Sequence, residues 1–264
     1  MPVSTKHSLL GVLEFFYGIY ALAVFLVLGF IAFVLVMLPL GLAARRHLAH
    51  FMARMLFRVA GMPLRLIDEQ NLPAGPCVVV ANHASYLDGV VLKAALPARF
   101  SFVIKKEVSR VPLAGLLLRR IGSEFVDRFN RHAGGMDTRR LIKAAHAGQA
   151  LAFFPEGTFL AQPGVGKFHT GAFAIAVRAA LPIVPVGIRG TRHILPSGRF
   201  LPRPGRIDIH LLPPLGPLAE MEPAVAIIET REQARSRILA ALGEPDLSQT
   251  DGIAALQARR SEST

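Results

Sequence analysis

The chain has 264 residues, a length that suits one α/β domain with an appendage and is too short for two full catalytic domains. Hydrophobic residues make up 52% of it, yet the formal net charge is +12, a combination that suits neither a simple soluble enzyme nor a disordered chain. A membrane surface suits both properties because anionic headgroups attract basic, partly apolar proteins, although nucleic acid or an acidic carrier protein would attract the same charge.

The N-terminal segment gives the strongest compositional signal. No charged residue occurs from Phe15 through Ala44, and the stretch Ile19–Leu42 is almost wholly apolar. This stretch exceeds the about 20 residues that a helix needs to cross a bilayer. It is longer than the apolar core of a signal peptide and ends in Pro39-Leu40-Gly41-Leu42 rather than at a small-residue cleavage site. We therefore interpret residues 1–44 as a retained, membrane-inserted segment.

The path of this segment stays open at the level of sequence. It is either a single span or a helical hairpin broken at Gly18, Gly29 or Pro39, and a very buried helix of a soluble domain would have the same composition. Only Lys6 precedes the apolar stretch, whereas several arginines follow it, so the positive-inside rule places the bulk of the chain in the cytoplasm. The arginines that follow are Arg45, Arg46, Arg54 and Arg58.

An amphipathic helix is expected next, at residues 45–61. From Ala43 to Ala60 the apolar residues recur every three or four positions, with Arg54 and Arg58 on another face. Packing on the domain and lying in the membrane interface explain this pattern equally well, because basic polar faces suit headgroups.

Residues 62–242 show short β-type runs separated by helical stretches. Strands are expected at Leu64–Ile67, Cys77–Ala81, Phe100–Ile104, Glu124–Val126, Leu151–Phe154, Ile183–Ile188 and Ile207–Leu212, and helices at Gly89–Ala95, Leu113–Arg120, His132–His146, Ala172–Ala180 and Arg231–Leu242. This alternation predicts an α/β fold: a layered, largely parallel sheet flanked by helices, with its site at the carboxyl ends of the strands. The remaining residues, 243–264, form a polar and irregular tail typical of partial disorder, except that Ile253–Ala258 has the pattern of a short helix.

A histidine and an aspartate follow one of the expected strands. Cys77–Ala81 runs directly into Asn82-His83-Ala84-Ser85-Tyr86-Leu87-Asp88 and then into a helical pattern. Asp88 can turn back to hold one imidazole nitrogen of His83 as a donor, which leaves the other nitrogen free to take a proton. A structural alternative is a helix capping box at Ser85-x-x-Asp88, in which Asp88 binds only backbone amides. The segment by itself leaves both interpretations open.

A second polar turn follows another strand. Leu151–Phe154 leads into Pro155-Glu156-Gly157-Thr158, again a carboxylate and a glycine at a strand end. Glu156 is either a solvated loop acid or one wall of a cleft shared with His83, since polar turns at adjacent strand ends would meet.

Four segments resemble, in order and spacing, the motifs of the glycerolipid acyltransferases, a family that includes bacterial 1-acylglycerol-3-phosphate acyltransferases. The first motif, Asn-His-x-x-x-x-Asp, is matched by Asn82, His83 and Asp88, with Ser85 in its usual place. Gly122 through Arg128 resembles the second, Phe154 through Thr158 the third, and Ile183 through Val186 the fourth. Each motif is short enough to arise by chance, but four in order behind an apolar N-terminus are specific together.

The resemblance implies an enzyme of phospholipid biosynthesis at the cytoplasmic face of the inner membrane. It would move a fatty acyl group from acyl-CoA or acyl carrier protein to the free hydroxyl of 1-acylglycerol-3-phosphate, with His83 as general base, Asp88 as its partner, and neither metal nor cofactor. A different lyso-lipid acceptor and a non-catalytic membrane-binding module are the alternatives, and the oligomeric state is open. The residues implied in substrate binding are Asn82, Ser85, Lys105, Arg128, Glu156, Gly157, Thr158, Pro185 and Arg189.

One position departs from the family pattern. Phe159 follows Thr158, where an arginine is usual. An acceptor phosphate would lose a bidentate partner there. Either another basic residue supplies the charge, or the acceptor carries less charge than lysophosphatidate. The basic residues considered are Lys105, Arg128, Arg189 and Arg192.

Other chemistries fail on details of the sequence. Gly166-Lys167 lacks the rest of a P-loop, and no Gly-x-Ser-x-Gly occurs. His132, His146, His169 and His193 show no paired zinc spacing, and three Tyr with no Trp leave few residues for stacking on nucleic acid. Cys77 is the single cysteine, which excludes an intramolecular disulfide, and its apolar run predicts a buried structural thiol.

Overall fold

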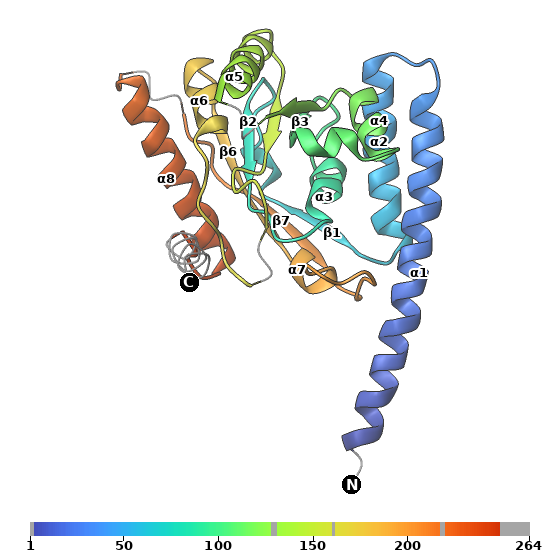
Figure 1. Ribbon diagram of the computed structural model, residues 1–264. Helices are drawn as coiled ribbons and strands as arrows, with labels where there is room; N and C mark the ends of the chain where they lie inside the picture. Colours follow the sequence, from blue (N-terminus) through green and yellow to red (C-terminus); the bar gives the residue numbers. More distant parts are fainter. Residues whose placement is uncertain (1–2, 128–130, 160–161, 217–219, 249–264) are drawn as a thin grey trace, which may run out of the picture.

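A helical hairpin packed beside a three-layer α/β domain makes up the molecule (Figure 1). The structure is a computed structural model that describes residues 3–127, 131–159, 162–216 and 220–248. Arg128 and the short helix expected at Ile253–Ala258 lie outside the described residues.

The hairpin consists of α1 (Val3–Met37) and α2 (Leu42–Val59), which run in opposite directions (Figure 1). α1 continues through Gly18 and Gly29, so neither glycine breaks the apolar segment. The break comes at Leu38–Gly41 and includes Pro39, whose missing N–H and fixed φ disfavour a continuous helix. The amphipathic helix expected from the apolar period is α2, and it turns Met52, Ala53, Leu56 and Phe57 inward.

The apolar part of α1 is long enough to cross a membrane by length and composition. It spans 27 residues, Gly11–Met37, and an 18-residue window within it has a mean hydropathy of 3.0 and is 17% buried. At ~1.5 Å per residue such a helix is about 40 Å long. Large apolar side chains, including Phe16, Leu26 and Phe30, are exposed along it.

Polar contacts hold this stretch in place. Near its start, Glu14 pairs with Arg203 of the domain at 3.6 Å, and two tyrosines bind the end of α2. Tyr17 Oη donates to the carbonyl of Ala60 at 2.9 Å, and Tyr20 Oη donates to that of Val59 at 2.7 Å. At the other end, the guanidinium of Arg120 donates to the carbonyls of Met37 and Leu38 at 2.9 Å. The hairpin is therefore part of the folded unit rather than a separate tail.

The sheet confirms the largely parallel α/β fold expected from the sequence. Its seven strands lie in the order β1-β7-β6-β2-β5-β3-β4, and every pairing is parallel except that of β6 with β7. The strands are β1 (Leu64–Ile67), β2 (Val78–Ala81), β3 (Ser101–Lys105), β4 (Glu124–Val126), β5 (Leu151–Phe153), β6 (Ile183–Arg189) and β7 (Ile207–Leu211).

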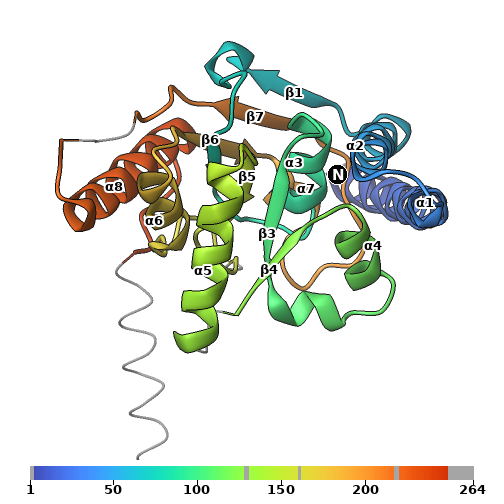
Figure 2. The same cartoon turned by 90° about the horizontal axis from the view of Figure 1, so that it is seen from above.

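Helices cover both faces of the sheet, as Figure 2 shows from above. The remaining helices are α3 (Asp88–Ala95), α4 (Ala114–Arg120), α5 (Arg131–His146), α6 (Gly171–Arg178), α7 (Thr191–Ile194) and α8 (Pro223–Leu242), with short 3₁₀ turns at Glu69–Asn71 and Lys106–Arg110. The start expected for the last helix, Arg231, is wrong. α8 begins at Pro223, because Glu222 caps it by accepting from the amides of Ala224 and Val225.

Strand β2 shows why the domain has three layers. Val79 and Ala81 belong to the hydrophobic cluster shared with α2 and α3, whereas Val78 and Val80 belong to the cluster shared with α5, α6 and α8. All four residues are fully buried. A strand that is apolar on both faces is typical of the centre of a parallel sheet, which explains the continuous run Cys77–Ala81.

Lys93, on α3, places an ammonium group inside the domain. The residue is 8% exposed, and its Nζ lies 5.8 Å from the centre of the Phe102 ring. Burial, and to a lesser degree the nearby charge of Arg46, lowers the pKa of Lys93 from 10.5 to about 8. Both effects disfavour the charged form.

Lys93 should therefore make stability depend on pH. Because the pKa is lower in the folded chain, the contribution to stability is present above pH 10.5 and is lost as the pH falls through about 8. We expect Lys93→Met to raise the free energy of unfolding at pH 7, by up to about 3 kcal/mol for a lowering of this size. The gain should shrink as the pH rises from 8 to 10.5. Chemical denaturation across this range checks it, with the exposed Lys143→Met as control; a gain independent of pH would contradict it.

Candidate active site

The two polar turns leave the sheet side by side. Strands β2 and β5 are parallel neighbours, and Val80 pairs with Phe153. Both strands therefore end at the same edge, and the turn that follows each one emerges next to the other. His83 and Glu156 meet where these two turns come together, as the two polar strand ends led us to expect.

Asp88 holds His83 and the turn at once. His83 Nδ1 and Asp88 Oδ2 are 2.8 Å apart; Asp88 is fully buried, and the His83 side chain is 20% exposed. The same carboxylate oxygen accepts the backbone N–H of Ala84 at 2.6 Å and that of Ser85 at 2.8 Å. The orienting and capping interpretations of the segment are thus compatible. One carboxylate performs both tasks.

The bond to Asp88 defines the tautomer of His83. A carboxylate only accepts, so Nδ1 carries the proton, and in neutral imidazole Nε2 is then the basic nitrogen. Within the described part of the chain, no hydrogen bond engages Nε2. The ring stacks on Phe154, with centroids 4.4 Å apart and planes 22° apart, and Phe159 lies 4.8 Å away. These contacts restrict the rotation of the ring and leave its basic nitrogen available.

Glu156 binds backbone amides of two different segments. Its Oε1 accepts the N–H of His83 at 2.7 Å, and its Oε2 accepts that of Gly166 at 2.8 Å. Burial raises the pKa of the Glu156 carboxyl, while these two amides and the charges of His83 and Arg192 pull the pKa back down. A solvated loop acid would have neither the burial nor the two partners. Glu156 therefore joins the turn to the residue that carries the imidazole.

The neighbouring residues of this turn differ in exposure. Gly157 has φ +79°, a left-handed conformation that glycine adopts without the strain of a side chain. Thr158 is exposed at the mouth of the turn, next to the half-buried Phe159. Tyr86 is 65% exposed and meets Phe159 edge-on at 4.8 Å. The rim beside His83 is thus aromatic.

Asn82 and Ser85, on either side of His83 in the chain, bind backbone groups of neighbouring segments. The Asn82 amide donates to the carbonyl of Ile188 at 3.1 Å and accepts the N–H of Ile188 at 2.7 Å, which joins the end of β2 to β6. Ser85 Oγ donates to the carbonyl of Leu195 at 2.7 Å and accepts from the amide of Leu87 at 3.2 Å. Pro185 lies buried within β6, opposite Val80. In this structure these polar groups bind protein atoms.

In the ranges that the structure describes, no group of three or more His, Cys, Asp and Glu residues is placed to hold an ion. The histidine, its carboxylate and the aromatic rim make a site for proton transfer to and from an organic substrate.

Comparisons with known proteins agree with these motifs. A family model described as Acyltransferase matches residues 64–189, which contain His83, Asp88 and Glu156. A chloroplastic 1-acyl-sn-glycerol-3-phosphate acyltransferase of Brassica napus is 32% identical over 159 residues, which are 58% of this chain and 46% of that protein. The segment that carries the candidate site is therefore similar to known acyltransferases.

Two other known proteins add detail to the comparison. A lyso-ornithine lipid O-acyltransferase of Pseudomonas aeruginosa is 33% identical over 144 residues, which are 53% of each chain. The crystal structure of PlsC, a 1-acyl-sn-glycerophosphate acyltransferase of Thermotoga maritima, shares the fold with a TM-score of 0.66 at 23% identity, over 87% of this chain and 96% of that one. The chain spans about half the length of the curated relatives it matches.

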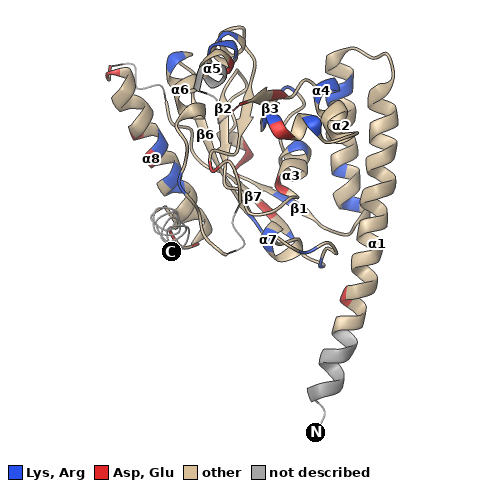
Figure 3. Cartoon of the chain, in the orientation of Figure 1, with Lys and Arg blue, Asp and Glu red and all other residues tan. Residues whose placement is uncertain are grey.

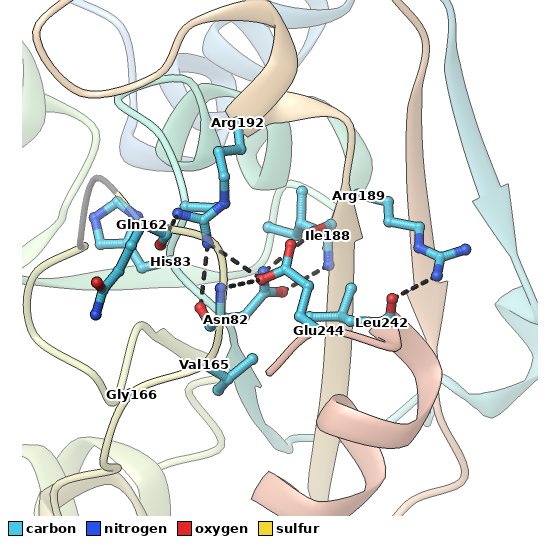
Figure 4. A network of polar contacts seen from close by, with 12 residues as sticks. Asn82, His83, Gln162, Val165, Gly166, Ile188, Arg189, Arg192, Leu242 and Glu244 are labelled. Carbon is cyan, nitrogen blue, oxygen red and sulfur yellow. Dashed lines mark hydrogen bonds and ion pairs between the residues drawn. The ribbon is translucent and has the colours of Figure 1, made fainter. Parts of the chain in front are cut away.

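The basic residues suggested to replace the family arginine are placed differently from one another. Lys105 is exposed at the end of β3. Arg189 donates to the carbonyl of Leu242, on the side of the network away from His83 (Figure 4). Arg192 donates to the carbonyls of Gln162 and Gly164 and pairs with Glu244. In this structure the guanidinium groups of Arg189 and Arg192 are thus bound to the protein.

Sequence reasoning missed the closeness of Phe159 to His83. It marked Phe159 as a departure from the glycerolipid acyltransferase pattern but did not place the ring beside the imidazole. It also missed Arg235 and Glu244, which bind the loop that holds Glu156, and Asp246, which binds Arg235. A charged residue inside the apolar face of α8 was the available signal for Arg235; the other two carried none.

Proposed function

We propose that this chain is a membrane-associated O-acyltransferase that acylates the free hydroxyl of 1-acylglycerol-3-phosphate and so makes phosphatidate for phospholipid biosynthesis. The acyl donor is a thioester, acyl-CoA or acyl carrier protein. The observation that carries the proposal is His83, whose Nδ1 lies 2.8 Å from a buried carboxylate while no hydrogen bond within the described residues engages Nε2. The printed names of the relatives support this choice of acceptor.

The residues present account for the chemistry without an enzyme nucleophile. A hydroxyl is a weak nucleophile until a base takes its proton, and imidazole titrates closest to neutrality. Nε2 of His83 accepts the hydroxyl proton as the oxygen attacks the thioester carbonyl carbon. The C–S bond then breaks, and the imidazolium returns the proton to the leaving thiolate. Asp88 stabilises the imidazolium in between.

A coupled assay tests the proposal directly. Purified protein in detergent receives an acyl thioester and lysophosphatidate, and both free thiol and phosphatidate are measured. The proposal expects the two products in equal amounts, and only when both substrates are present. Thiol release without acceptor would indicate a hydrolase, and no thiol release would favour the membrane-binding module; either result would overturn the proposal.

A different lyso-lipid acceptor is the second candidate, and Phe159 is the observation that favours it. Phe159 lies 4.8 Å from His83, where a family arginine would approach an acceptor phosphate. A hydrogen bond to a charged group contributes about 1.5–3 kcal/mol, so its loss lowers affinity roughly ten- to a hundredfold. The relative named for a lyso-ornithine lipid shows that acceptors differ among proteins of this similarity.

The variant Phe159→Arg distinguishes lysophosphatidate from a different lyso-lipid as the natural acceptor. With lysophosphatidate as the natural acceptor, other cations supply the charge, and Phe159→Arg should change its Michaelis constant little. Lys105→Ala or Arg128→Ala should then raise that constant by up to roughly tenfold. Arg189→Ala is the control, because its guanidinium donates to Leu242. A large gain in lysophosphatidate turnover for Phe159→Arg, absent for Phe159→Leu, would reject the first-choice acceptor.

We propose a location at the inner membrane, with the domain on the cytoplasmic face, and the apolar helix of the hairpin supports membrane association. The ion pair of Glu14 with Arg203 and the hydrogen bonds from Arg120 fasten both ends of the apolar stretch to the domain. If the whole apolar stretch of α1 crossed the bilayer at a right angle, the domain fastened to it would be pulled into the bilayer. If the hairpin inserted into one leaflet only, the domain would stay at the membrane surface. Basic residues occur along α2, where Arg46 and Arg54 donate to carbonyls of the domain, and α1 lines the outer edge of the molecule (Figure 3). We propose the hairpin arrangement.

Salt and detergent should then act differently on membrane binding. We expect the protein to stay with the membrane fraction in high salt and to leave it in detergent, because salt screens charge but does not weaken hydrophobic insertion. Replacing the exposed Phe16 and Phe30 with lysine should weaken the association. Sedimentation with membranes measures both effects. A full-length protein that washes off in salt would exclude insertion.

A further inference from the structure

The segment that follows α8 pairs with the loop that holds Glu156. We call residues 244–247 the C-terminal latch. The amide of Val165 donates to the carbonyl of Pro245, and the amide of Leu247 donates to the carbonyl of Val165, each at 3.0 Å. The loop allows this approach because Gly164 has φ +140°, and a Cβ there would lie 2.4 Å from Leu247. Val165, which makes both hydrogen bonds, is fully buried.

Arg235 binds the loop and the latch together. Its guanidinium is 9% exposed and donates to the carbonyl of Gly166 at 2.8 Å and to that of Val165 at 3.1 Å. Both terminal nitrogens also bind the carboxylate of Asp246. These bonds from Arg235 lower the pKa of Asp246. A bidentate, charge-assisted pair of this kind restricts geometry more than a single hydrogen bond does.

Glu244 makes a second link between the same two segments (Figure 4). Its Oε2 accepts the amide of Gly164 at 2.9 Å and the guanidinium of Arg192 at 3.2 Å. Arg192 also donates to the carbonyl of Gln162 at 2.7 Å. The loop from Gln162 to Gly166 is thus held from both sides.

The chain of contacts ends at the proposed general base. Gly166 donates its N–H to Glu156, and Glu156 accepts the N–H of His83. We infer that the C-terminal latch positions His83 through Glu156, and that Glu244, Asp246 and Arg235 are positioning residues for acyl transfer. The inference rests on the proposed function. None of these side chains touches His83 itself. They therefore affect the position of the imidazole and not its chemistry.

A positioning role predicts loss of turnover without loss of binding. A displacement of about 1 Å at a reacting group can lower the rate by about 10²-fold. We expect Glu244→Ala and Asp246→Ala each to lower kcat by roughly tenfold and to leave both Michaelis constants unchanged. Glu244→Gln should restore much of the rate, because its amide oxygen still accepts. Arg237→Ala is the control, an arginine on α8 that donates to Pro213 outside the latch.

Two further measurements separate positioning from general stability. Glu244→Ala should cost much less in a Glu156→Gln background, where the link to His83 is already weakened; a purely structural effect would be the same in both backgrounds. Hydrogen exchange should rise in peptides covering His83 and Gly166 but not in one covering α5. Arg235→Ala leaves buried carbonyls unpaired and so destabilises the fold as well. The test therefore uses the variants at Glu244 and Asp246.

The outcomes distinguish this inference from the proposed function. Folded Glu244→Ala and Asp246→Ala proteins with wild-type kcat, or with raised Michaelis constants alone, would overturn the latch. A wild-type chain that transfers no acyl group would overturn the proposed function. In that case, faster exchange at His83 in the latch variants would still support the mechanical link, and unchanged exchange would reject it.

Discussion

His83→Ala is expected to lower kcat by about 10²–10⁴-fold, the range that general-base help contributes to a rate. Without Nε2 no group at the site takes the acceptor proton, and the hydroxyl stays a weak nucleophile. Binding of the thioester should change little, because the imidazole acts on the acceptor. Initial rates of thiol release at saturating substrate measure the effect.

The fold should survive this change. Glu156 holds the backbone N–H of His83, which alanine keeps, and the lost side chain is 20% exposed. A circular dichroism melt close to that of the wild type is therefore expected. His193→Ala, at an exposed position on α7, is the matched control and should keep full activity. Near-normal turnover in His83→Ala would show that another group is the base.

Asp88→Asn has the second-largest expected effect, and it should change both rate and stability. The neutral amide does not stabilise the imidazolium and can hold His83 in the wrong tautomer, so we expect kcat to fall about a hundredfold or more. Asp88 Oδ2 also accepts two backbone amides in the buried turn. Weakening these bonds should lower the free energy of unfolding by about 1–3 kcal/mol.

Ser85→Ala separates the two roles of Asp88. Ser85 Oγ supports the same turn through Leu87 and Leu195 but has no bond to the imidazole. We expect this variant to lose stability while keeping most of its turnover. If Asp88→Asn behaved in the same way, with a lower melting temperature and a normal rate, capping would be the only role of Asp88.

The sequence by itself was enough to predict the alternation of strands and helices, the parallel sheet and the apolar N-terminal helix. Each of these depends on a local pattern: the run Cys77–Ala81 is apolar at every position because both faces of β2 are buried. The contact between His83 and Asp88 was also accessible, since five residues across a strand-to-helix turn bring the two side chains together. A resemblance between short motifs then supplied the chemistry.

Only the tertiary structure decided what the other polar residues contact. Asn82 binds Ile188, Glu156 binds His83, and Arg235 binds the loop at Gly166, each far away in the sequence. No local pattern indicated that residues 244–247 of the polar tail would pair with that loop. Periodicity reports which face of an element is buried, whereas the partner of a polar group depends on which strands become neighbours. That order, β6-β2-β5 at this site, results from packing the whole core.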